Sequence, residues 1–213
     1  MKTLIRDIAP EEIEAESFRI IAEELGPTSF DPATFTVVRR VIHATGDFSF
    51  ADNMRFHPRA ISAGIAAIRE GRNILTDVTM AAAGVSRGLA AQWGGQVICR
   101  VGEAEVAARS KAIGATRSGV AMEMGLLDGN IGIVAVGNAP TALVKVMELM
   151  GQMAENARPA LVIGVPVGFV NAVESKQLLA EKDYPFITSL GRKGGSPVAA
   201  AIVNALIRLA RED

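Results

Sequence analysis

The stretch Ile131-Gly132-Ile133-Val134-Ala135-Val136-Gly137-Asn138-Ala139-Pro140 decides the fold. It opens with an uninterrupted apolar run, which is typical of a strand buried on both faces of a parallel sheet. Glycine and asparagine then mark a tight turn, and proline is favoured in the first turn of a helix. The stretch therefore predicts a strand that passes directly into a helix, which is the repeating unit of an α/β fold.

The same pattern of a short apolar strand followed by a helix recurs on both sides of this stretch. Strands are predicted at 73–77, 96–101, 131–136, 160–164 and 186–190. Helices are predicted at 78–93, 103–127, 140–157, 172–182 and 196–211. Strands that alternate with helices in this way predict a three-layer α/β/α fold with a five-stranded parallel sheet.

Additional N-terminal helices are expected before the first predicted strand. Residues 10–24 form an acidic amphipathic pattern, and 58–70 is a further helical stretch. Between them, Asp31 is a helix cap and Gly46 a left-handed stop, which together predict a helix that ends just before Gly46. The connection at 47–53 is rich in turn residues. Its two phenylalanines are expected to cap the core, and the alternative is that they face a flat ligand.

Length, charge and cysteine content exclude several classes of protein. The 213 residues fit one domain, 1–213, at roughly 150 residues per domain. A formal net charge of -1 gives no basic field for nucleic acid. No apolar run approaches the roughly 18 residues that cross a bilayer, and Cys99 is the only cysteine. We therefore expect a cytoplasmic protein that binds neither nucleic acid nor membranes and has no cysteine-based metal site.

His43 is the first candidate for chemistry, because it is one of only two histidines in the chain. It falls in the last turn of its predicted helix, and Arg39 and Arg40 precede it at helical spacing on the same side. A histidine in this position is a candidate proton donor. The alternative is a histidine that fills the helix end and bonds to a last-turn carbonyl group.

The loops that follow the predicted strands are the second candidate. Ligands of open parallel sheets bind beyond the carboxyl ends of the strands. The glycine-rich loops there are 137–142, 164–171 and 191–197. Free N–H groups at the helix starts favour anions, and Arg192 and Lys193 add positive charge, so a ligand with several negative groups is expected. The alternative is that glycine and proline only mark tight turns.

The sequence contains no P-loop, dinucleotide motif, nucleophile elbow or histidine pair at metal spacing.

Thr116-Arg117-Ser118-Gly119 interrupts the helical stretch 103–127. Arg117 is therefore expected at a helix start, where a guanidinium can bind a carboxylate through two hydrogen bonds. A surface salt bridge is an equally good interpretation of this arginine.

Several segments together resemble the precorrin-8X methylmutase family of cobalamin biosynthesis, and the match covers nearly the whole chain. The segments are 14–18, 40–43 with 47–48, 76–80, 116–118, 137–142, 164–170 with 174–176, and 191–196. The last three are long and specific, and the order of the segments agrees. The pair Asp47-Phe48 is more similar to the cobalt-containing, anaerobic branch of the family.

The resemblance implies an isomerase that moves a methyl group from ring carbon C11 to C12 of a tetrapyrrole, converting precorrin-8 or its cobalt form to hydrogenobyrinate or cobyrinate. It implies no cofactor, and any cobalt is carried by the substrate. His43 matches the catalytic histidine, while Ser17 and Arg40 match substrate-contacting positions. Arg117 and Lys193 are added as substrate-binding residues from their charge and loop positions. The family also implies a homodimer in which a site can borrow residues from its partner.

Two other functions stay open at this point. A non-catalytic corrin carrier would use the same pocket, with His43 as a plain hydrogen-bond donor. An enzyme that acts on a phosphate ligand would use the same scaffold, although the absence of phosphate-binding motifs disfavours it.

Overall fold

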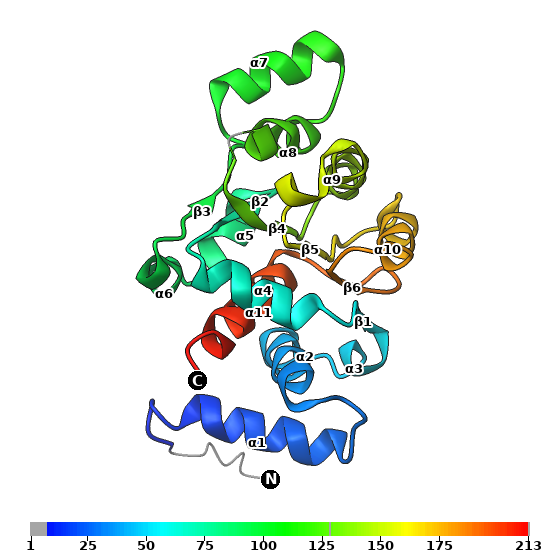
Figure 1. The fold of residues 1–213 in the computed structure, drawn as a ribbon. Coiled ribbons are helices and arrows are strands. Elements are labelled where there is room, and N and C mark those ends of the chain that lie inside the picture. Colours follow the sequence, from blue (N-terminus) through cyan, green and yellow to red (C-terminus); the bar gives the residue numbers. More distant parts are fainter. Residues whose placement is uncertain (1–7, 128, 213) are drawn as a thin grey trace.

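The computed structural model describes residues 8–127 and 129–212. A six-stranded sheet runs through the middle of this part of the chain, in the order β1-β6-β5-β4-β2-β3 (Figure 1). The strands are β1 (Met54–Phe56), β2 (Asn73–Thr76), β3 (Val97–Ile98), β4 (Ile131–Val136), β5 (Leu161–Gly164) and β6 (Phe186–Ser189). Strands β2 to β6 are parallel, and β1 pairs with β6 in the antiparallel direction.

The predicted parallel strands are confirmed, but the five-stranded sheet is wrong by one strand. β1 was missed because three residues are too few to show an alternating pattern. It exists because its backbone pairs with β6, with Met54 opposite Ser189 and Phe56 opposite Ile187. β1 therefore carries the chain from the carboxyl edge of the sheet back to its amino edge.

One face of the sheet is covered by the helices α4 (Ala60–Arg69), α5 (Thr79–Gly84) and α11 (Ser196–Leu209). Helix α2 (Pro32–Thr45) packs on α11, and α1 (Ile13–Leu25) lies outside α2 (Figure 1). The short helix α3 (Phe50–Asn53) follows α2. These elements share one large cluster of buried apolar side chains.

The other face is covered by α8 (Arg117–Leu127), α9 (Pro140–Gln152) and α10 (Ala172–Ala180) over a second apolar cluster. Helix α7 (Ala104–Ile113) packs outside α8. Two 3-10 helices, η1 (Ala91–Trp93) and η2 (Glu155–Ala157), are also described. The three-layer α/β/α arrangement is confirmed, with the N-terminal helices added on the α11 side (Figure 1).

The predicted helix at 78–93 is broken into α5, α6 (Arg87–Ala90) and η1. The side chain of Asn204 holds the break, because its amide donates to the Gly84 carbonyl at 2.9 Å and accepts the Ser86 N–H at 2.8 Å. A helix cannot continue through backbone groups that are bonded elsewhere.

Helix α2 has the predicted ends. The Asp31 carboxylate accepts the N–H groups of Ala33 and Thr34 at 3.0 and 3.1 Å, and Gly46 closes the helix in the left-handed conformation. Beyond Gly46, Phe50 is buried in the core as expected. In the described part of the chain, no helix combines the length and the apolar character that crossing a bilayer requires.

Candidate active site

The carboxyl ends of β2, β4, β5 and β6 meet at one edge of the sheet because these strands are parallel. The buried carboxylate of Asp77, just after β2, accepts the N–H groups of Gly137, Asn138 and Ala139 at 3.0, 2.8 and 2.8 Å. Burial raises the pKa of Asp77, while the three N–H donors oppose that shift. The loop after β4 was expected to offer these N–H groups to an anionic ligand. That expectation is wrong, because Asp77 occupies them.

The loops after β5 and β6 lie against each other. Gly194 has a φ of +158°, and a side chain there would place its Cβ atom 2.2 Å from the carbonyl oxygen of Val165. The Gly195 N–H donates to that same oxygen at 2.8 Å, and the Gly168 N–H donates to the Arg192 carbonyl at 3.1 Å. Glycine is required at 194 for this close approach, which joins the two loops into one unit.

Lys193 extends from this unit to the segment that follows α2. Its ammonium lies 2.6 Å from the Asp47 carboxylate and donates to the Ser49 hydroxyl at 2.9 Å. The hydrogen bond from Lys193 is the main cause that lowers the pKa of Asp47, and one from Ser49 adds to it. Lys193 therefore lies near the end of the His43 helix, but with its charge already paired.

A second lysine, Lys176, holds the backbone of Lys193, and the sequence analysis gave this lysine no role. Lys176 on α10 is fully buried, and its ammonium donates to the Lys193 carbonyl at 2.6 Å. The Ser189 hydroxyl donates to the same carbonyl at 3.2 Å. Burial lowers the pKa of Lys176 to about 8. The signal was present in the segment 174–176, since a lysine at a helix position that faces the sheet is unusual.

His43 is exposed in the last turn of α2, at the rim of a hollow of about 240 Å³. Ser17 and Phe48 also line this hollow. The imidazole meets the ring of Phe18 edge-on, with the centroids 5.4 Å apart. Among the described residues His43 has no hydrogen-bond partner, so the alternative in which it bonds to a last-turn carbonyl is wrong. With respect to residues 8–127 and 129–212, the imidazole nitrogens are therefore open to a ligand.

Arg40 lies beside His43 but already holds a carboxylate. Two of its guanidinium nitrogens contact the two oxygens of Glu14 at 2.9 and 3.0 Å. The hydrogen bond from Arg40 is the main cause that lowers the pKa of Glu14. The guanidinium groups of Arg40 and Arg39 also lie over the Phe18 ring, at 4.9 and 4.4 Å from its centroid. Phe18 is therefore the contact that both arginines and His43 share.

The other two predicted substrate-binding residues differ in their placement. The Ser17 hydroxyl donates to the Ile13 carbonyl at 2.8 Å, which leaves its oxygen lone pairs as acceptors in the hollow. Arg117 is the first residue of α8, as expected, and is exposed. Helices α8 and α2 lie toward opposite ends of the molecule (Figure 1). The structure thus brings together Ser17, Arg40 and His43, ties Lys193 to them through Asp47, and leaves Arg117 apart.

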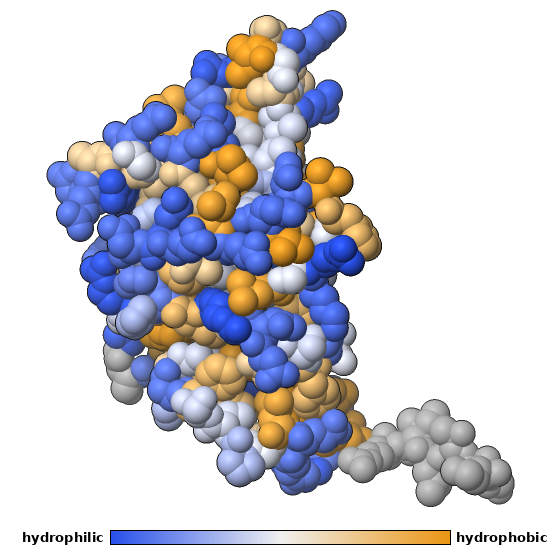
Figure 2. All heavy atoms as spheres, turned by 90° about the vertical axis from the view of Figure 1, so that its right-hand side faces the viewer, coloured by the Kyte–Doolittle hydropathy of each residue, from blue (hydrophilic) through white to orange (hydrophobic). Residues whose placement is uncertain are grey.

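The loop after β5 also carries an apolar surface that sequence reasoning missed. Val167, Phe169 and Val170 are 46%, 83% and 78% exposed, and the Arg192 guanidinium lies 5.3 Å from the centre of the Phe169 ring. Figure 2 shows the face of the molecule that carries α9 and α10, where apolar groups form separate patches between polar ones.

Within residues 8–127 and 129–212, no group of three metal-ligating side chains is found.

Comparisons with known proteins agree on one family. A family model described as precorrin-8X methylmutase matches residues 12–209. The cobalt-precorrin-8 methylmutase of Priestia megaterium is 43% identical over 203 residues, which cover 95% of this chain and 89% of that protein. The precorrin-8X methylmutase of Pseudomonas aeruginosa is 42% identical over 195 residues, covering 90% and 91%. A crystal structure of the Thermus thermophilus precorrin-8x methyl mutase matches with a TM-score of 0.87 and 45% identity, covering 95% and 97%.

Proposed function

The chain belongs to the precorrin-8X methylmutase family, and on that basis we propose a site for its methyl shift: the open hollow at the end of α2. The protein is an isomerase of cobalamin biosynthesis that moves a methyl group on a precorrin, which is a tetrapyrrole. Its relatives are named as methylmutases, which disfavours a mere carrier of corrins. We propose that residues 1–213 act in this reaction as one domain.

The observation that carries the proposal is the exposed imidazole of His43 beside the Ser17 hydroxyl. In the reaction the bond between the methyl carbon and C11 breaks as the bond to C12 forms, so the composition of the ring does not change. His43 gives a proton or hydrogen bond to the ring nitrogen beside the migrating methyl group and so favours the reactive tautomer. Little charge moves in such a shift, and the enzyme mainly has to hold one conformer.

No external methyl donor or oxidant is needed, because the methyl group leaves and rejoins the same ring. The proposal therefore includes no cofactor, and cobalt enters only as part of the substrate. Relatives of both names, cobalt-precorrin-8 and precorrin-8X methylmutase, match at similar identity. Supplying the metal-free and the cobalt-containing precursor to the same enzyme decides between the two substrates.

The acid groups of the ring need cations to hold them, and we propose Arg40 and Lys193 for this role. Both already touch a carboxylate, Glu14 and Asp47 respectively, so each cation is oriented before the ligand arrives. The hollow of about 240 Å³ accepts one edge of the macrocycle rather than the whole ring. Ser17 would accept a hydrogen bond at that edge.

We propose that the enzyme acts in the cytoplasm as a homodimer in which Arg117 completes the site of the partner subunit. The support is its position, since Arg117 is exposed and lies toward the opposite end of the molecule from His43 (Figure 1). The test mixes two inactive variants, His43→Ala and Arg117→Ala. Activity that appears only after mixing supports a shared site, and a mixture that stays inactive while both variants form dimers rejects it.

The main test replaces His43 with Ala and measures turnover and product binding separately. We expect turnover to fall by about 10²–10⁴-fold, the usual contribution of a general acid, while product binding persists. The control is His57→Gln, because His57 is the other histidine and lies between β1 and α4. Retained turnover in His43→Ala removes His43 from the mechanism. An unchanged absorption spectrum when precursor meets substoichiometric wild-type enzyme would favour the carrier.

A further inference from the structure

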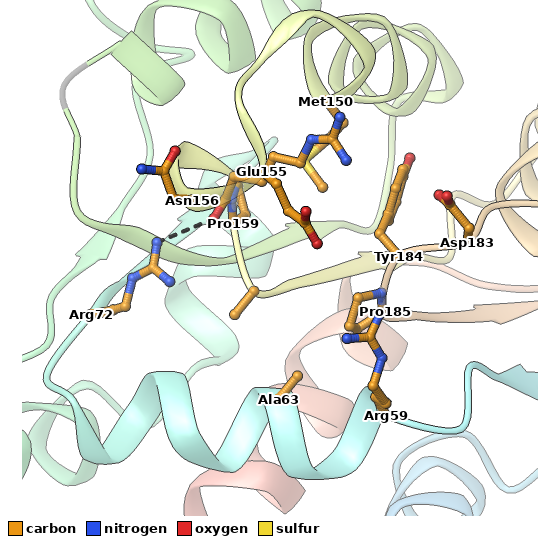
Figure 3. Close-up of a pocket in the computed structure, with 12 residues that line it drawn as sticks. Arg59, Ala63, Arg72, Met150, Glu155, Asn156, Pro159, Asp183, Tyr184 and Pro185 are labelled. Atoms are coloured by element: carbon orange, nitrogen blue, oxygen red, sulfur yellow. Dashed lines mark hydrogen bonds between the residues drawn. The ribbon is translucent and has the colours of Figure 1, made fainter.

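A second cavity lies at the opposite edge of the sheet, where the strands begin (Figure 3). Its volume is about 440 Å³, larger than the hollow beside His43 and within the usual range for small-molecule sites. It is enclosed by the start of α4, the residue before β2, η2, and the segments that enter β5 and β6. None of the residues proposed for the methyl shift lines it.

Charged side chains converge on this cavity without pairing. They are Arg59, Arg72, Arg158, Glu155 and Asp183. Over the part of the chain that the structure describes, none of the five forms an ion pair with another. Three cations and two anions held apart around one cavity leave room for a ligand between them.

Two of the arginines are fixed in place by the backbone. The Arg72 guanidinium donates to the Ile131 carbonyl at 2.7 Å and to the Arg158 carbonyl at 3.4 Å, the second of which is drawn in Figure 3. The Nε of Arg158 donates to the Met153 carbonyl at 3.1 Å. Within the described part of the chain, the terminal nitrogens of Arg158 have no hydrogen-bond partner and keep their donors for a ligand. A guanidinium that is anchored at Nε is oriented for two-point contact with a carboxylate.

Tyr184 forms part of the wall and is the only tyrosine in the chain. Its hydroxyl is buried and has no hydrogen-bond partner among the described residues. Burial raises the pKa of this hydroxyl to about 12, so it is a donor at neutral pH. In Figure 3 the ring stands next to Asp183, with the hydroxyl directed away from Pro185. A unique tyrosine at the cavity wall gives a single spectroscopic reporter for its contents.

We propose that this cavity binds a small ligand with a carboxylate at one end and an ammonium group at the other, such as an ω-amino acid. Arg158, which is anchored through its Nε, binds the carboxylate, and Glu155 of the neighbouring 3-10 helix η2 binds the ammonium group. A polyanion is disfavoured by the two acids, and a simple cation is disfavoured by the three arginines. The site is independent of the methyl shift, because it lies at the other edge of the sheet.

The experiment titrates the 213-residue protein, labelled at the tyrosine ring, with 4-aminobutyrate and follows the ring signal by NMR. Butyrate and butylammonium are titrated in parallel, because each carries one half of the probe. We expect a saturable shift with 4-aminobutyrate and about tenfold weaker binding of each half. Arg158→Gln and Glu155→Gln should each weaken binding of 4-aminobutyrate by about tenfold. The exposed Arg87 on α6 supplies the matched control, Arg87→Gln, which should bind like the wild type.

Three results would overturn the proposal. One is the lack of a saturable shift up to about 50 mM probe. Another is equal binding of butyrate and 4-aminobutyrate, which would show that the acids contribute nothing. The third is unchanged binding in a folded Arg158→Gln variant. Because Glu155 is exposed, Glu155→Gln is expected to fold and keeps the test informative if Arg158→Gln does not.

Discussion

The ammonium of Lys193 lies 2.6 Å from the carboxylate of Asp47 and joins the loop after β6 to the end of the His43 helix. The two side chains are 56% and 30% exposed, so the pair contributes less than about 1 kcal/mol to stability. The ion pair instead holds a segment in place, because Asp47 begins the connection four residues after His43. The contact is thus expected to matter more for turnover than for folding.

Removing either partner of this pair tests that expectation. Lys193→Met and Asp47→Asn should each lower turnover by about tenfold or more, with only a small change in melting temperature. The double variant should be no worse than the single ones, because the second change removes a contact that is already lost. Lys145→Met, which breaks the exposed pair with Glu148, is the matched control. Additive losses of turnover would mean that the two residues act separately.

The ion pair between Arg40 and Glu14 predicts that the free energy of unfolding falls at acidic pH. Since Arg40 lowers the pKa of Glu14 below its ordinary 4.5, the pair stabilises the fold above that pH, and its contribution is lost as the pH falls through the lowered value. Glu14→Gln should remove this part of the acid transition, an effect of about 1 kcal/mol at a half-exposed site. Urea unfolding between about pH 6 and pH 3 measures it.

Lys176 predicts how the free energy of unfolding changes at alkaline pH. Its pKa is lowered from 10.5 to about 8 by burial, so the unfolded chain binds this proton more tightly than the folded one. The contribution of Lys176 to stability should therefore rise between about pH 8 and pH 10.5, by up to about 3 kcal/mol, and should stay constant below about pH 8. Lys176→Met should abolish the rise while lowering turnover through the loop at Lys193. The exposed Lys111→Met is the control, and a rise that persists in Lys176→Met would contradict the assignment.

Gly194 and Gly191 form a matched pair for testing the contact between the loops. Gly194→Ala would bring a Cβ atom within 2.2 Å of the Val165 carbonyl, whereas nothing lies within 4 Å at Gly191. Gly191→Ala meets only the strain of a positive φ, about 1–2 kcal/mol. Gly194→Ala should be more destabilising, by about 3 kcal/mol or more, and should also lower turnover. Equal unfolding midpoints for the two variants would show that the loop after β6 can move away without penalty.

The sequence predicts those features that depend on local physics. The α2 helix has its expected ends because a capping carboxylate and a left-handed glycine act within a few residues. Buried parallel strands are recognisable from uninterrupted apolar runs such as 131–136, since both faces must be apolar. His43 could be placed next to Arg39 and Arg40 for the same reason, because helical spacing is a local rule.

Features that depend on distant partners could not be predicted in this way. The guanidinium of Arg40 is held by Glu14, a glutamate 26 positions earlier in the chain, and no pattern around Arg40 indicates this partner. Asp77 takes N–H groups that lie 60 to 62 positions later. β1 is a strand only because β6 lies alongside it. In each case the decisive partner is set by tertiary packing, which a pattern within one segment does not contain.

The antiparallel strand β1 also has a consequence for how the protein is synthesised. It pairs with the last strand of the sheet, and α2 packs on the last helix. Ser49 and Lys193, which meet across this join, are 144 positions apart. Contacts of such long range slow folding, and a ribosome releases the N-terminal segment well before its partners exist. The apolar face of α2 therefore stays uncovered until translation is nearly complete, and the end of the molecule that carries His43 assembles last.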